Sequence, residues 1–162
     1  MSTPTRILLV GCGRMNLSHV QGLKKLPELA TIVAGVDPSK TARQNIETEH
    51  GISPTYANLD EALNQVEADA AIIAVPNNLH ADYTQSCLKK GLHVLIEKPM
   101  ALSLEDVDAM IATAEAQNRL LMSGQSQRFS NAIRYVKHLL DNNTVGNIRH
   151  IMHRRLGAGR GG

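Results

Sequence analysis

The fold of this chain is decided by one stretch near its start, which reads Ile7-Leu8-Leu9-Val10-Gly11-Cys12-Gly13-Arg14-Met15-Asn16. Four apolar residues run into two glycines spaced by one residue, and apolar residues at helical spacing follow. This pattern is typical of a buried parallel strand, a glycine turn and the N-terminus of a helix. Gly11 would permit the tight turn, and Gly13 would let the backbone approach a pyrophosphate at the positive end of the helix. The stretch therefore predicts a dinucleotide-binding turn with contacts from residues 11–16.

The third position of the dinucleotide fingerprint, which is usually glycine, is Asn16 in this chain. A glycine there allows the helix to pack closely on the strand, so a side chain should push the helix outward or shift the turn. Asn tolerates unusual backbone angles better than most residues, which lowers the cost. We therefore expect Asn16 to be tolerated within the cofactor-binding turn.

A second apolar run, residues 31–36, ends at Asp37 and Pro38. Asp37 lies about 20 residues beyond the glycines, where such folds place an acid on the adenosine ribose. The alternative is that the two glycines form an ordinary turn and that Asp37 caps a helix beginning near Ser39. We favour cofactor binding, with contributions from Asp37 and Pro38.

Composition limits the other classes of function. The chain has 162 residues, which is enough for one good core, and a net charge of +2 with acids and bases intermixed. Its two cysteines are too few for a disulfide framework. No N-terminal signal and no apolar run of membrane-spanning length is visible. No metal is expected. We therefore expect a cytoplasmic protein without a membrane or nucleic-acid partner. Nucleic-acid binding by arginines in the glycine-rich tail (149, 154, 155 and 160) is a minor alternative.

Strand-like and helix-like segments alternate regularly along the chain. Strands are expected at Arg6–Val10, Thr31–Val36, Ala70–Val75, His93–Ile96, Leu120–Met122 and, last, Asn147–His153. Helices are expected from the glycine turn to near Lys25, through Ala42 to His50, at Leu59–Val66 and His80–Lys90, from Leu104, and around Ala132–Leu140. This alternation predicts an α/β fold, a Rossmann-type doubly wound parallel sheet.

Polar and glycine residues follow each expected strand, at its carboxyl end. They are Gly11 and Gly13, Asp37, Pro76 to His80, Glu97 to Pro99, and Gln125 to Phe129. Ligands of open doubly wound sheets bind outside these carboxyl ends. The sequence therefore predicts that the five segments meet at one cleft.

Three further segments carry a resemblance to a known family. They are Glu97-Lys98-Pro99 followed by residues 100–103, the segment Val75-Pro76-Asn77-Asn78-Leu79-His80, and Gln127-Arg128-Phe129. With the glycine turn, they resemble the N-terminal half of the Gfo/Idh/MocA (glucose–fructose oxidoreductase, inositol dehydrogenase, rhizopine catabolism) family, from Gly11 to about His153. The resemblance implies a nicotinamide-dependent oxidoreductase acting on a sugar, a polyol or a related hydroxy compound.

The resemblance also implies roles for single residues. Lys98 would be catalytic, its ammonium bonding the substrate hydroxyl that becomes a carbonyl and stabilising alkoxide character there. Glu97 would orient or charge-balance Lys98, Pro99 would fix the turn, and Arg128 would approach the cofactor or substrate. Without the resemblance, these four residues read as a surface ion pair, a loop proline and a surface arginine.

The cofactor cleft would be lined by Val75, Pro76, Asn77, His80 and Glu97, with His80 starting the following helix. His19 is expected to pack its helix rather than to act as a catalyst. Since Asp37 accepts bonds from ribose hydroxyls and repels a 2′-phosphate, NAD is preferred. NADP stays open, because Lys40 and Arg43 would reach that phosphate if Asp37 turned aside.

The domain organisation is expected to be an NAD(P)-binding domain over residues 1–124 and, over 125–162, the first helix and strand of a truncated substrate and oligomerisation domain. The rest of that domain would supply the family's distal Asp and His, so activity of this chain alone is left open. A non-catalytic dinucleotide-binding module, serving as a sensor or partner subunit, is the alternative. The last strand has no sheet to join, which predicts either pairing with a second copy, and thus a homo-oligomer, or fraying of the strand.

Overall fold

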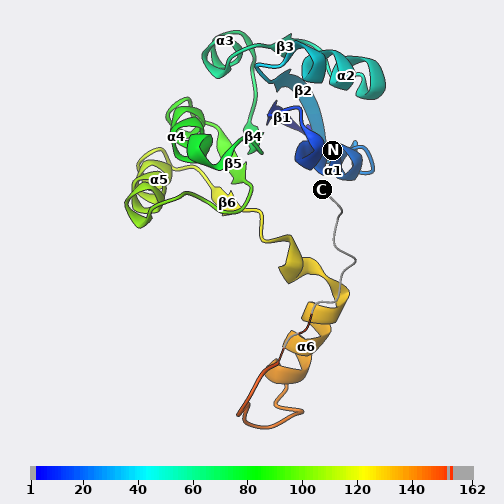
Figure 1. The fold of residues 1–162 in the computed structure, drawn as a ribbon, viewed down its shortest axis with the longest axis vertical. Coiled ribbons are helices and arrows are strands. Elements are labelled where there is room, and N and C mark those ends of the chain that lie inside the picture. Colours follow the sequence, from blue (N-terminus) through cyan, green and yellow to red (C-terminus); the bar gives the residue numbers. More distant parts are fainter. Residues whose placement is uncertain (1–2, 153, 155–162) are drawn as a thin grey trace. The chain divides into compact units, whose positions relative to one another are not determined.

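The computed structural model of this chain describes residues 3–152 and 154 (Figure 1). The chain divides into two compact units, residues 1–124 and residues 125–162. All strands of the described residues lie in the first unit. In the described part of the chain no helix is long and apolar enough to span a membrane, and no group of three metal-ligating side chains occurs.

The first unit is built on one six-stranded sheet with the strand order β3-β2-β1-β4-β5-β6, in which every neighbouring pair is parallel. The strands are β1 (Thr5–Val10), β2 (Ala30–Val36), β3 (Thr55–Tyr56), β4 (Ala70–Ile73), β5 (His93–Ile96) and β6 (Leu121–Ser123). The direction of winding reverses between β1 and β4, which is where doubly wound folds bind their ligands. The predicted fold class is confirmed.

Five α-helices connect these strands. They are α1 (Arg14–Leu23), α2 (Lys40–His50), α3 (Leu59–Gln65), α4 (His80–Lys89) and α5 (Leu104–Ala116), and the short 3-10 helix η1 (Asn77–Leu79) precedes α4. Side chains cap three of them, because Ser39, Asn58 and Ser103 each accept a bond from a backbone N–H of the first turn. No side chain of the described residues caps α1, whose N-cap residue is Gly13.

Each face of the sheet carries its own core. Leu8 and Val10 of β1 pack in a cluster with residues of α3, α4 and α5, and the last two helices lie side by side (Figure 1). Ile7 and Leu9 pack instead with residues of α1 and α2. Successive side chains of a strand point to opposite faces, so one apolar run can fill both cores.

One strand of the sheet was not predicted. β3 is only two residues long, Thr55–Tyr56, and pairs with the end of β2. A two-residue strand contains no alternation that a pattern search can detect. β4 also ends at Ile73, two residues before the predicted end of that apolar run.

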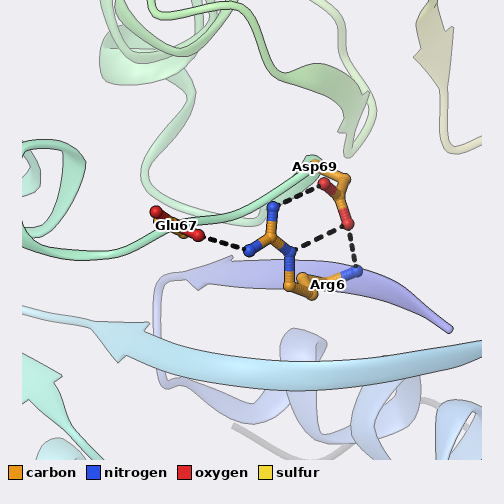
Figure 2. A network of polar contacts seen from close by, with 3 residues as sticks. All are labelled: Arg6, Glu67 and Asp69. Carbon is orange, nitrogen blue, oxygen red and sulfur yellow. Dashed lines mark hydrogen bonds and ion pairs between the residues drawn. The ribbon is translucent and has the colours of Figure 1, made fainter. Parts of the chain in front are cut away.

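At the amino end of β1, three side chains form the polar network drawn in Figure 2. The Arg6 guanidinium donates to both carboxylate oxygens of Asp69, at 2.9 and 3.2 Å, and to Glu67 at 2.8 Å. The backbone N–H of Arg6 also donates to Asp69, at 2.8 Å. The network joins the start of β1 to the residue that precedes β4, and the Arg6 guanidinium holds the pKa of Asp69 below its usual range.

The second unit contains a 3-10 helix, η2 (Ser126–Phe129), and one helix, α6 (Asn131–Asp141), which Ser130 caps. The predicted strand from Asn147 is wrong over the described residues 147–152, none of which is in a strand, and His153 lies outside the described residues. A strand needs a partner for its backbone groups, and the described part of this unit offers none. Arg155, Leu156 and the tail from residue 157, with Arg160, also lie outside the described residues.

Candidate functional site

The glycine turn between β1 and α1 has two glycines with different requirements. Gly11 has a φ of +92°, and a Cβ atom built on it would lie 2.4 Å from the backbone oxygen of Ala74. Only glycine fits this position, for reasons of conformation and of space. A Cβ on Gly13 would meet no atom within 4 Å, so its open side is available to a ligand.

Asn16 does not behave as the sequence suggested. Its side chain is fully buried, and Nδ2 donates to the backbone oxygens of Val10 at 2.9 Å and of Gly11 at 2.6 Å. Asn16 Oδ1 is buried and has no hydrogen-bond partner among the described residues. The expectation of a merely tolerated, outward-pushing side chain is therefore wrong, because Asn16 holds the two carbonyls of the turn from inside the protein. Its contact with a cofactor stays a prediction.

Asp37, at the end of β2, is fixed by two backbone donors. Its Oδ2 accepts from the Cys12 N–H and its Oδ1 accepts from the Ser39 N–H, both at 2.8 Å. Arg43 donates to the backbone oxygens of Asp37 and Pro38, at 2.6 and 3.1 Å. A rotation of Asp37 away from the turn would break two hydrogen bonds, so this carboxylate stays beside the glycines.

Cys12, within the turn, has a packing role. The residue is 6% exposed, and burial together with the nearby Asp37 charge raises the pKa of its thiol to about 12. The thiol therefore stays protonated near neutral pH and is a poor nucleophile.

A cavity of about 470 Å³ opens at the glycine turn, at the carboxyl edge of the sheet. Eight of the predicted cofactor-binding residues line it, namely Gly11, Gly13, Arg14, Met15, Asp37, Pro38, Val75 and Pro76. Five further residues that were not predicted also line it, namely Val36, Ala57, Ala74, Leu79 and Tyr83. Leu79 is the last residue of η1 and lies within the predicted segment of residues 75–80, and Tyr83 follows four residues later in α4. This helical spacing was available as a signal.

The other predicted cofactor-binding residues, Cys12, Asn16, Asn77, His80 and Glu97, do not line this cavity. Asn77 is exposed at the start of η1. Arg128 is exposed in η2 of the second unit.

His80 is buried, with 1% of its surface exposed, and both of its ring nitrogens face backbone oxygens. Nδ1 lies 2.7 Å from the Pro99 oxygen, and Nε2 lies 3.0 Å from the Val75 oxygen. The contact of this side chain with a cofactor stays a prediction. Because both ring nitrogens are occupied, His80 ties the segment after β4 to the segment after β5.

The Glu97 carboxylate, at the end of β5, contacts α1. Its Oε1 lies 3.1 Å from His19 Nε2, and its Oε2 accepts from the backbone N–H of Lys98 at 3.2 Å. The side chains of Glu97 and His19 are 13% and 24% exposed. His19 therefore belongs to the candidate site. No local sequence pattern signals its contact with Glu97, because 78 residues separate the two.

Lys98 and Pro99 follow Glu97 and are both exposed. Among the described residues, the Lys98 ammonium has no ion-pair or hydrogen-bond partner. A cation without a carboxylate on it can bond a developing negative charge on a bound substrate.

The cavity fits a dinucleotide. The N-terminus of α1 carries no side-chain cap and no acidic residue in its first turn, so its N–H groups suit a pyrophosphate. Asp37 would supply an acceptor for ribose hydroxyls, and Val75, Leu79 and Tyr83 line the cavity with mostly apolar surface.

Comparisons with known proteins find similar dehydrogenases. A myo-inositol 2-dehydrogenase from Thermotoga maritima is 28% identical over 141 residues, which cover 87% of this chain and 42% of that protein. A glucose-6-phosphate 3-dehydrogenase from Bacillus subtilis is 31% identical over 143 residues, which cover 88% of this chain and 40% of that protein. The chain thus spans about two fifths of the length of these relatives.

Solved structures share the fold. The WlbA dehydrogenase from Bordetella pertussis, in complex with NADH and UDP-GlcNAcA, has a TM-score of 0.85 at 28% identity, covering 90% of this chain and 42% of that chain. The scyllo-inositol dehydrogenase from Lactobacillus casei, with bound NAD(H) and scyllo-inositol, has a TM-score of 0.83 at 25% identity, covering 89% and 43%. Residues 5–125 match the family described as "Oxidoreductase family, NAD-binding Rossmann fold", so the predicted resemblance is confirmed and the chain belongs to the Gfo/Idh/MocA oxidoreductases.

Proposed function

We propose that this chain is the NAD(H)-binding part of an oxidoreductase that transfers hydride between the nicotinamide cofactor and a sugar, a polyol or a related hydroxy compound. The observation that carries the proposal is the cavity at the uncapped N-terminus of α1, with Gly13 and Asp37 on its wall. Solved relatives that hold NADH or NAD(H) support it.

The chain's own residues would divide the work. The N–H groups at the start of α1 would hold the pyrophosphate, and Asp37 would accept from the adenosine ribose. Lys98 would donate from its ammonium to the substrate oxygen and stabilise the negative charge that develops there. The nicotinamide, when bound, supplies the hydride chemistry.

NAD is the proposed cofactor rather than NADP. The Asp37 carboxylate would repel a 2′-phosphate, and its two backbone donors keep it in place. Arg43 is already engaged by the oxygens of Asp37 and Pro38, which reduces its availability to a phosphate.

Gly13→Val tests the proposal for the cofactor. The added side chain would project into the cavity where no protein atom lies, so we expect NADH binding by calorimetry to weaken at least about a hundredfold while the circular dichroism spectrum is retained. Gly22→Val is the matched control, since Gly22 lies near the other end of α1, also has open space at its Cβ position and does not line the cavity. Equal NADH affinity of the two variants would refute the placement of the pyrophosphate.

A second measurement separates an oxidoreductase from a non-catalytic binding module. We expect a panel of sugars and polyols to include a compound that reduces NAD, and Lys98→Met to slow that reduction by about a hundredfold without changing NADH affinity. Binding of NADH without any reduction across the panel would favour the module.

A further inference from the structure

We propose that His19 is a positioning residue for Lys98, acting through the carboxylate of Glu97. The role of Lys98 in this statement rests on the proposed function. The chain of contacts runs from His19 Nε2 to Glu97 Oε1, at 3.1 Å, and from Glu97 Oε2 to the Lys98 N–H, at 3.2 Å.

The Glu97 carboxylate is confined on more than one side. Only 13% of its side chain is exposed. A Cβ atom on Gly124, after β6, would lie 3.2 Å from Glu97 Oε1 and 3.3 Å from its carboxyl carbon. Because the backbone of Gly124 closes one side, His19 is the polar partner that determines where Oε1 points.

The direction of Glu97 follows from the pleat of β5. Leu95 packs with the cluster of α1 and α2, and Glu97, two residues later, falls on the same face of the strand. His19 extends from α1 toward that face, one turn after the buried Asn16. The contact therefore links the helix that begins at the glycine turn to the segment that carries Lys98.

The arrangement separates the charge of Glu97 from that of Lys98. Both carboxylate oxygens have partners, His19 and the Lys98 backbone N–H, so neither is engaged by the ammonium. Of the two roles expected of Glu97, this bond to the Lys98 backbone favours orienting Lys98 over balancing its charge. His19 holds Glu97 in this state and leaves the ammonium free for a substrate oxygen.

Two variants of His19 test the linkage in the ligand-free chain. His19→Ala removes the ring, whereas His19→Gln keeps an N–H donor at a similar reach. We expect the Lys98 amide proton to shift upfield in the NMR spectrum of His19→Ala, because its acceptor is no longer held, and to return toward the parent value in His19→Gln. Gln21→Ala, at an exposed site of the same helix, is the control and should leave that resonance unchanged.

A double variant distinguishes positioning from a general effect on α1. In a Glu97→Ala background, His19→Ala should cause no further shift of the Lys98 amide, since the intermediary is already absent. An undiminished shift in that background, or no shift in His19→Ala alone, would overturn the proposal.

Titrations with NADH and with ADP-ribose, which lacks the nicotinamide, complete the test. We expect His19→Ala to bind both ADP-ribose and NADH as the parent does, because the change affects only the position of Lys98, on which NADH affinity does not depend. Equal weakening of both ligands would mean that His19 supports α1 as a whole, and would overturn the proposal. If the parent binds neither ligand, the proposed function fails, while the NMR result still decides the role of His19.

Discussion

The glycine turn after β1 and the Glu97-Lys98-Pro99 segment after β5 both follow parallel strands of one sheet, yet their polar groups are held differently. In the turn, side chains bond the backbone directly: the buried Asn16 bonds two carbonyls and the partly buried Asp37 bonds two N–H groups. In the second segment Lys98, the proposed catalytic residue, is exposed, and its two neighbours contact histidines: Glu97 contacts His19 and the Pro99 oxygen contacts His80.

The difference corresponds to two kinds of task. A pyrophosphate is bound by backbone N–H groups, so the backbone itself must be fixed before the ligand arrives. A catalytic ammonium must reach a substrate oxygen, so its side chain stays free while the residues beside it are fixed. Loss of the bonds that Asn16 makes within the turn should therefore change stability and cofactor binding together, whereas substitutions around Lys98 should separate the two.

The largest effect is expected for Asn16→Asp. The change keeps the shape of the side chain but points a carboxylate oxygen at the carbonyl oxygens of Val10 and Gly11, which Asn16 approaches to 2.9 and 2.6 Å. We expect the free energy of unfolding in urea to fall by about 3 kcal/mol, since two bonds are replaced by repulsion in a buried site.

Asn16→Gly is the comparison for that prediction. It restores the usual fingerprint but removes both bonds, so we expect a loss of about 1–2 kcal/mol rather than improved binding. Full stability in either variant would show that the turn does not depend on Asn16, and the contrast between the two regions would be lost.

Asn16 also shows which features of the site could not be predicted from the sequence alone. The apolar runs, their alternation with helices and the residues after each strand were sufficient to predict the parallel sheet and its binding edge, because these signals are local. The buried amide of Asn16 was not predictable, since the fingerprint describes which residue is usual and not which bonds a replacement makes.

The histidines illustrate the same limit across longer distances. His80 was expected to face the cofactor, and His19 was expected only to pack its helix. The first bonds Val75 and Pro99, and the second contacts Glu97, 78 residues away. A single sequence does not indicate which distant residue a side chain will bond. Contacts between segments far apart in the sequence are therefore seen only in the folded chain.

A smaller effect, on specificity rather than stability, is expected for Asp37→Ser. The serine removes the charge that disfavours a 2′-phosphate, and NAD loses an acceptor for its ribose hydroxyls. We expect NAD affinity to fall by about tenfold and NADP affinity to rise, as measured by calorimetry with both cofactors. Asp60→Ser, in the first turn of α3 and away from the cavity, is the control. An unchanged ratio of NAD affinity to NADP affinity in Asp37→Ser would show that Asp37 does not contact the adenosine ribose.

The smallest effect is expected at the opposite, amino end of the sheet, in the network of Arg6 with Asp69 and Glu67. Arg6 lowers the pKa of Asp69 in the folded chain, so the folded state favours the ionised carboxylate. The resulting stabilisation is present above the unfolded pKa of an Asp and is lost as pH falls through the lower folded value. We expect the melting temperature of the parent to decrease in acid more than that of Arg6→Met, with a modest difference because the side chains of Arg6 and Asp69 are about two fifths exposed.

NADH affinity at neutral pH should be the same in Arg6→Met and in the parent, since the network lies at the far end of β1 from the cavity. The two results for Arg6→Met, acid stability and NADH affinity, together test whether local bonds determine the geometry of the glycine turn. A loss of NADH affinity in Arg6→Met would mean that the whole sheet, and not the local bonds of Asn16 and Asp37, sets the geometry of the turn.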